Sequence, residues 1–152
     1  MIEVRVQLEP FDPGFELARL EALAPGAVAS FTGLVRGDDG LVAMELEHYP
    51  AMTQAALERV VAEAVSRWPL SGVIVIHRHG RLVPGDRIVF VGSASSHRAA
   101  ALESCAFLID WLKTRAPFWK REVLGDGSAR WVEARSADDS AAARWGEKGA
   151  GS

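Results

Sequence analysis

The segment LKTRAPFWKRE, residues 112–122, places two lysines on either side of a proline. Pro117 disfavours the helical conformation at Ala116, so the chain must leave the preceding helix at this point. The enforced bend allows Lys120 to fold back beside Lys113. Ammonium groups that share one pocket lower each other's pKa, which makes an amine useful for proton transfer near neutral pH. The segment therefore contains a candidate catalytic pair.

Alternation along the strand after the bend decides which side chains share a face with the second lysine. One face carries Phe118, Lys120 and Glu122, and the opposite face carries Trp119, Arg121 and Val123. A lysine pair near a carboxylate is one interpretation. Plainer ones remain open, because Lys113 suits the negative end of a helix dipole and can pair with Asp110. Lysine on an exposed edge strand also discourages aggregation.

Three further cations stand where anions bind readily. Arg36 ends an expected strand beside a glycine-containing loop, and His97 with Arg98 opens an expected helix, whose free backbone N–H groups favour anions. A cation is unfavourable at the positive end of a helix dipole, so this placement favours a bound anion. Lys113 closes the same helix roughly 24 Å away, so both helix ends cannot bind one small group.

Other chemistries have little support in the sequence. The single cysteine, Cys105, lies within an apolar run, which favours inert packing over nucleophilic use. His77 and His79 are expected on one strand face, as in some zinc sites, but no nearby pattern completes a ligand set, so no metal is expected. The sequence contains no glycine-rich phosphate loop, Gly-x-Ser-x-Gly motif or Cys-x-x-Cys pair.

Length and composition indicate one soluble domain. The chain has 152 residues, of which 49% are hydrophobic, enough to bury a core. No apolar stretch approaches the roughly 20 residues that cross a bilayer, and the N-terminus lacks a signal-sequence pattern, so a cytoplasmic location is expected. The formal net charge of -3 argues against a broad electrostatic surface for nucleic acid or anionic membrane. A bound anion must therefore meet a local cluster of cations.

Hydrophobic periodicity predicts the elements that position these residues. Strands are expected at residues 2–8, 27–36, 41–49, 72–80, 87–95, 118–124 and 129–135. Helices are expected at 13–23 after an Asp12 N-cap, at 53–68, and to Arg115 from a cap at Ser95 or Ser96. The turns GDDG and GDGS predict hairpins joining 27–36 to 41–49 and 118–124 to 129–135.

This order of elements predicts an α+β domain with mostly antiparallel sheets and three main helices. A single domain is expected over residues 1–135. Residues 136–152 are small and polar, and they are expected to form a flexible C-terminal tail.

From about Ala27 to Arg135, the segments FTGLVR, LEHYPAMT, RWPL, VIHRHG, PGDRIVFVGSASSHR, DWLKTRAPFWKRE and RWVEAR follow one another. Together they resemble the large, catalytic subunit of molybdopterin synthase. The resemblance implies an α/β hammerhead fold with an added α+β subdomain. It also implies that the chain converts cyclic pyranopterin monophosphate (precursor Z) into molybdopterin by inserting two sulfurs, in molybdenum cofactor biosynthesis. It implies no cofactor.

The same resemblance implies a protein partner. In this family a ubiquitin-like small subunit carries the sulfur as a thiocarboxylate on its C-terminal Gly-Gly, and threads that tail into the large subunit. A homodimer of large subunits forms the core of a heterotetramer. By resemblance, Lys113 and Lys120 line the pocket that receives the tail. One lysine transfers protons and the other stabilises negative charge, with either assignment open.

The resemblance also assigns the remaining candidate residues. By resemblance, Arg36, His97 and Arg98 bind the phosphate of the pterin substrate, and one hypothesis places them in a pocket shared across the homodimer. Arg121 and Glu122 complete the WKRE motif as further substrate-binding residues.

Two alternatives belong to other functional classes. A noncatalytic adaptor would bind a ubiquitin-like glycine tail through sheet edges and basic residues, without turnover. A module for small phosphates or RNA is disfavoured by the acidic net charge and by the lack of interleaved aromatic and basic residues.

Overall fold

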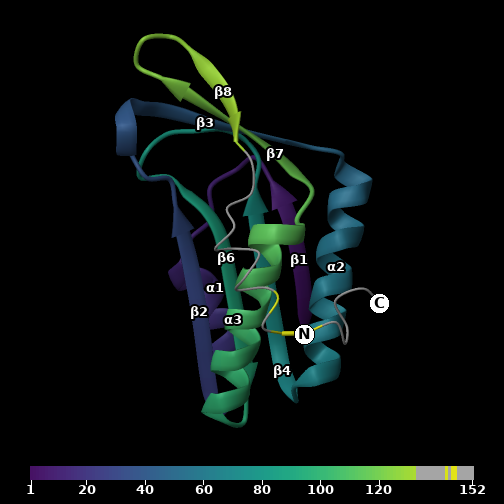
Figure 1. Ribbon diagram of the computed structural model, residues 1–152. Coiled ribbons are helices and arrows are strands. Elements are labelled where there is room, and N and C mark those ends of the chain that lie inside the picture. The colour runs from purple at the N-terminus through teal and green to yellow at the C-terminus, as the bar shows by residue number, and fades with distance from the viewer. Residues whose placement is uncertain (133–142, 144, 147–152) are drawn as a thin grey trace.

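The computed structural model describes residues 1–132, 143, 145 and 146. The strands are β1 (Ile2–Gln7), β2 (Ala27–Leu34), β3 (Leu41–His48), β4 (Leu70–Arg78), β5 (Gly80–Leu82), β6 (Arg87–Ser95), β7 (Phe118–Leu124) and β8 (Ala129–Val132). The helices are α1 (Pro13–Glu21), α2 (Pro50–Arg67) and α3 (Arg98–Arg115), with a 3-10 turn, η1 (Asp38–Gly40). The predicted α+β class with three main helices is confirmed (Figure 1).

The larger sheet has the strand order β1-β4-β6-β2. The pair β1–β4 is parallel, whereas β6 pairs antiparallel with both β4 and β2. Helices α2 and α3 cover one face, and α1 covers the other (Figure 1). Strand β4 is buried on both faces, which explains its continuous apolar run. Val73 and Val75 pack towards α2 and α3, and Ile74 and Ile76 pack with Leu20 of α1.

The smaller sheet has the order β5-β3-β7-β8, and all its pairs are antiparallel. The predicted hairpin of 118–124 with 129–135 is confirmed as β7–β8, although residues 133–135 lie outside the described residues. The predicted hairpin of 27–36 with 41–49 is wrong, because β2 and β3 belong to different sheets. Val35 and Leu41 are both buried with Leu82 where the two sheets meet, so the chain crosses between sheets instead of reversing.

The strand predicted at 72–80 is divided between the two sheets. Strand β4 ends at Arg78, and β5 begins at Gly80 and pairs with β3. Gly80 has a φ of +89°, a conformation that glycine adopts without steric cost, and the chain changes sheet there. The change of direction places His79 at the junction between the sheets.

Helix starts follow local rules only where no buried contact overrides them. Asp12 caps α1, since its side chain accepts from Gly14 N at 3.0 Å, as predicted. The predicted cap of α3 at Ser95 or Ser96 is wrong, because α3 begins at Arg98 and His97 is the N-cap. Ser95 is instead buried as the last residue of β6, where its hydroxyl donates to Pro69 O at 2.8 Å.

The helix predicted at 53–68 begins earlier, at Pro50, and ends at Arg67. Proline suits the first position of a helix because that position needs no backbone donor. Thr53 therefore belongs to the first turn of α2 and is fully buried in the protein. Its hydroxyl lies 3.1 Å from His48 Nδ1.

Cys105 is packed inertly in α3, as predicted. Its side chain is buried against the larger sheet, and burial raises the pKa of the thiol to about 11. Most of the segment 136–152 lies outside the described residues, so its flexibility remains a prediction. Trp145 is described, and its ring packs on Trp68 and Phe107 while its indole N–H donates to Asp110 Oδ2 at 2.7 Å.

Among the described residues, no helix combines the length and the apolar character needed to cross a membrane.

Candidate active site

Strand β7 presents one face to the interior, as the alternation predicts. In the β3–β7 pairing, Phe118 lies opposite His48 and Lys120 lies opposite Leu46. Leu46 is buried, and Phe118 packs against the same cluster of side chains. Lys120 is accordingly partly buried, whereas Trp119 on the other face is 45% exposed.

The bend after α3 brings the two lysine-bearing elements together. Helix α3 ends at Arg115, and Ala116 is extended (φ −67°, ψ 126°), as expected for a residue before proline. Figure 1 shows β7 beginning where α3 ends. Lys113, in the last turn of α3, is exposed, and Lys120 follows the bend on the inward face of β7.

The ring of His77 lies within electrostatic range of both lysines. It stacks on Phe118 with the ring centroids 4.0 Å apart and the planes 18° apart. The pKa of His77 is lowered to about 4, chiefly by burial and then by the charges of Lys120, His48 and Lys113, against a raising contribution from the Arg78 carbonyl. Both amines act on the same imidazole, so the structure brings them to the same side of the molecule.

A second pair of imidazoles borders this cluster. The rings of His48 and His79 have centroids 4.4 Å apart, and His48 lies 5.5 Å from the ring of Phe118. Burial, and secondly the charge of His79, lower the pKa of His48. Within the described part of the chain, no three His, Cys, Asp or Glu side chains are grouped as metal ligands.

The other two residues of the WKRE motif are engaged by neighbouring strands. Arg121 pairs with Glu45 on β3, with an Nη2–Oε1 distance of 2.7 Å. Glu122 accepts from Arg130 Nε on β8 at 2.9 Å. Their predicted roles in substrate binding remain predictions. In this structure these pairs join the strands of the smaller sheet.

The predicted phosphate ligands lie at opposite ends of the larger sheet within one chain. Ala27 pairs with Ser95 and Leu34 pairs with Arg87, so His97 and Arg98 follow one end of the β2–β6 pair and Arg36 follows the other. A strand of 8 residues spans about 26 Å. Arg36 is exposed and has an Nε–Oδ2 distance of 3.7 Å to Asp38. A single chain therefore cannot close these three cations around one phosphate.

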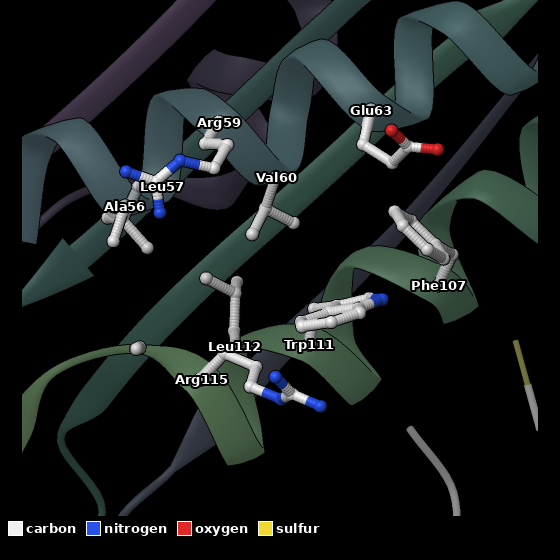
Figure 2. A pocket seen from close by; sticks show the side chains of 10 residues that line it. Ala56, Leu57, Arg59, Val60, Glu63, Phe107, Trp111, Leu112 and Arg115 are labelled. Carbon is white, nitrogen blue, oxygen red and sulfur yellow. The ribbon is translucent and has the colours of Figure 1, made fainter. Parts of the chain in front are cut away.

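Sequence reasoning missed a groove between α2 and α3 (Figure 2). Its volume is about 190 Å³, and it is lined by Ala56, Leu57, Arg59, Val60, Glu63, Phe107, Trp111, Leu112, Arg115 and Ala116. None of the predicted site residues lines it. The Trp111 indole N–H is buried without a hydrogen-bond partner in the described part of the chain, and the Arg115 guanidinium lies 4.4 Å from the Trp111 ring centroid. The sequence shows both helices but not how closely they approach, so it gave no signal of the groove.

The low pKa of His77 predicts a loss of stability in mild acid. The pKa falls from an ordinary 6.5 to about 4 on folding, so between these values the unfolded chain binds a proton that the folded chain does not. This contribution is fully present above pH 6.5 and is lost as the pH falls towards 4, by up to about 3 kcal/mol. Urea unfolding at several pH values is expected to show a shallower pH dependence for His77→Phe than for wild type. Parallel pH profiles for the two proteins would contradict this.

The chain is similar to known proteins both in sequence and in structure. Residues 6–115 match the family described as MoaE protein. The molybdopterin synthase catalytic subunits of Mesorhizobium japonicum and Escherichia coli K12 are 54% and 55% identical, covering 93% and 90% of this chain and 92% and 93% of their own. The molybdopterin biosynthesis MoaE protein structure from Burkholderia ambifaria has a TM-score of 0.81 at 53% identity, covering 95% of this chain and 98% of that chain.

Proposed function

The chain belongs to the MoaE protein family, as a catalytic subunit of molybdopterin synthase in molybdenum cofactor biosynthesis, and we propose that it acts as a sulfurtransferase. Its substrate is cyclic pyranopterin monophosphate, which it converts to molybdopterin by two sulfur insertions. The sulfur comes from the C-terminal thiocarboxylate of a ubiquitin-like small subunit. In each transfer a carbon–sulfur bond to the pterin side chain forms as a carbon–oxygen bond of that side chain breaks. Water then cleaves the bond between the sulfur and the acyl carbon of the tail, which leaves the sulfur on the pterin and an ordinary carboxylate on the tail.

The bend at Ala116 is the observation that carries this proposal, because it joins the last turn of α3, which carries Lys113, to β7, whose inward face carries Lys120. A thiocarboxylate is an anion, and its transfer develops negative charge on sulfur and oxygen. Lys113 and Lys120 supply two amines for stabilising that charge and for moving the accompanying protons. Lys120 is partly buried, where its charge is less screened by water, and Lys113 is open to solvent, where a tail can enter.

We infer that the three predicted phosphate ligands meet only when a second copy of the chain is present. Strand β2 is at the edge of the larger sheet, and no other described strand pairs with its outer side. Phe31 and Leu34 on this edge are 36% and 55% exposed. An exposed strand edge readily pairs with an identical edge, and two copies then lie antiparallel about a twofold axis.

If two copies pair about a twofold axis centred near Phe31, Arg36 of one copy lies opposite the partner's Gly26. Gly26 lies directly against the Ser96 carbonyl, where a Cβ atom would clash. Arg36 therefore comes beside the partner's His97 and the partner's Arg98. We assign the phosphate of the substrate to this shared cluster, at the same end of the sheet as Lys113 and Lys120.

The activity is tested by reconstitution. Purified chain, thiocarboxylated small subunit and cyclic pyranopterin monophosphate are expected to yield molybdopterin, measured by mass spectrometry. Small subunit ending in an ordinary carboxylate is the matched control and is expected to give no product. Tight binding of the small subunit with no product from either form would instead support the adaptor function.

A further inference from the structure

At Trp145, the part of the chain that follows β8 contacts both long helices. The ring of Trp145 lies edge-on to the rings of Trp68 and Phe107, with centroid distances of 5.7 and 5.5 Å. Phe107 is fully buried in α3, and Trp68 is the C-cap of α2. Aromatic rings prefer this edge-to-face arrangement. Trp145 therefore fills an aromatic site to which α2 and α3 each contribute a ring.

Two polar contacts orient Trp145 in this site. Its indole N–H donates to Asp110 Oδ2 at 2.7 Å, and its carbonyl oxygen accepts from Arg67 Nη1 at 3.2 Å. Hydrogen bonds to a charged group are stronger than those between neutral groups. Arg67 is held in turn by Glu63 at 2.8 Å, and its guanidinium lies 4.7 Å from the ring centroid of Phe107. The site thus offers an acceptor for the indole, a donor for the backbone and aromatic walls.

A turn gathers the groups that enter the site into a short stretch of chain. Gly146 has a φ of +78°, which glycine adopts without steric cost, and its N–H donates to the Ala143 carbonyl at 2.9 Å. The indole and the carbonyl that contact the helices both belong to Trp145. A peptide of a few residues around Trp145 therefore contains these contacting groups.

We propose that the surface formed by Trp68, Phe107, Asp110 and Arg67 is a peptide-docking site, which recognises tryptophan and is occupied by the chain's own C-terminal segment. Tryptophan combines a large apolar ring with one N–H donor, which matches the aromatic walls and the carboxylate of the site. Phenylalanine has no such donor. The inference concerns α2 and α3 and does not rest on the proposed sulfur transfer.

The connection through the chain determines how fully the site is occupied. Residues 133–144 join Val132, the end of β8, to Trp145. A tether of about a dozen residues gives an effective concentration on the order of 1 mM. With a Kd of about 0.1 mM for the free peptide, the tethered segment is docked in roughly ten of eleven molecules. The dock is thus closed most of the time and opens readily.

Peptide binding to the full-length chain tests the site. A fluorescein-labelled peptide with the sequence of residues 141–148 is titrated with the Trp145→Ala chain and with wild type, and fluorescence anisotropy is recorded. Saturable binding to Trp145→Ala is expected, about tenfold tighter than to wild type, where Trp145 competes. The same peptide with alanine in place of tryptophan is the matched control and is expected not to bind. Equal affinities of the two peptides, or of the two chains, would overturn the proposal.

The hydrogen bond to Asp110 is tested from both sides. In the Trp145→Ala chain, the further change Asp110→Leu is expected to weaken peptide binding at least about tenfold, whereas Asp110→Asn keeps an acceptor and recovers part of the loss. Glu21→Leu, at an exposed position of α1 on the other face of the larger sheet, is the matched control. A peptide with 1-methyltryptophan removes the N–H without altering the chain and is expected to bind as weakly. Unchanged affinity in both tests would place the peptide elsewhere.

Nuclear magnetic resonance identifies the occupant in the wild-type chain. The indole N–H resonance of Trp145 is expected to shift in Asp110→Asn and to keep its docked position when the protein is diluted, because docking within one chain is independent of concentration. A docked resonance found only in dimer fractions would assign the site to the partner's segment and contradict the proposed occupant. These measurements need neither the small subunit nor the pterin, so their outcome is separate from that of the reconstitution.

Discussion

Replacing Lys113 or Lys120 by alanine is expected to lower molybdopterin formation by about 10²- to 10⁴-fold, the usual contribution of a group that transfers protons in the reaction. The two residues lie on either side of the bend at Pro117, and their charges act on the same imidazole. Each variant removes an amine that no neighbouring side chain replaces in the proposed mechanism. The double variant is expected to lose little more than the more damaging single variant, because residues that act as a unit are not additive.

Controls separate this loss from a structural effect. Lys113 is exposed, so Lys113→Ala is expected to change the free energy of unfolding by less than about 0.5 kcal/mol. Both variants should still form the complex with the small subunit, measured by size-exclusion chromatography. Arg59→Ala, which removes a cation from the exposed side of α2, is the matched control and is expected to retain activity. Wild-type rates in both lysine variants would remove these residues from the site.

Mixing two inactive variants is expected to restore activity. If Arg36 of one copy meets the partner's His97 and the partner's Arg98, neither an Arg36→Ala dimer nor a His97→Ala/Arg98→Ala dimer has an intact phosphate cluster. A mixed dimer has one intact cluster, since each copy supplies what the other lacks. Random exchange makes half of the dimers mixed, so an equimolar mixture should reach about a quarter of the wild-type activity.

The experiment needs evidence that subunits exchange. Differently tagged chains, unfolded and refolded together, are purified on both tags in turn, and the doubly tagged fraction is assayed with the small subunit. Each variant alone is expected to lose at least about tenfold in rate, because a charged contact to the phosphate is missing. A doubly tagged mixed dimer that remains as inactive as its parents would contradict a cluster shared between copies.

The local features of this chain could be predicted from its sequence because neighbouring residues decide them. Asp12 with Pro13 marks the start of α1, and the proline after Ala116 ends α3. Alternation then places Lys120 and Phe118 on the inward face of β7, and the GDGS turn closes the β7–β8 hairpin. In each case the backbone conformation follows from steric limits or side-chain caps within a few residues.

Errors arose where a distant contact overrides a local preference. Ser95 is a good helix cap, but its hydroxyl bonds the Pro69 carbonyl within the larger sheet, and α3 starts later. The GDDG turn favours a hairpin, but burial of Val35 and Leu41 with Leu82 leads the flanking strands into different sheets. The free energy of burying apolar side chains exceeds the preference of one turn or cap.

The sequence alone determined the candidate lysines, the bend between them and the family resemblance, since all of these depend on residue types and short spacings. Only the tertiary structure decided that His77 of β4 stacks on Phe118, on the face of β7 that also carries Lys120, because no local pattern encodes how these two strands meet. Strand order likewise decided that Arg36 lies far from His97 within one chain. Spacing along the chain decides which residues are neighbours in sequence. Burial of apolar side chains and strand pairing decide which distant residues come together in the fold.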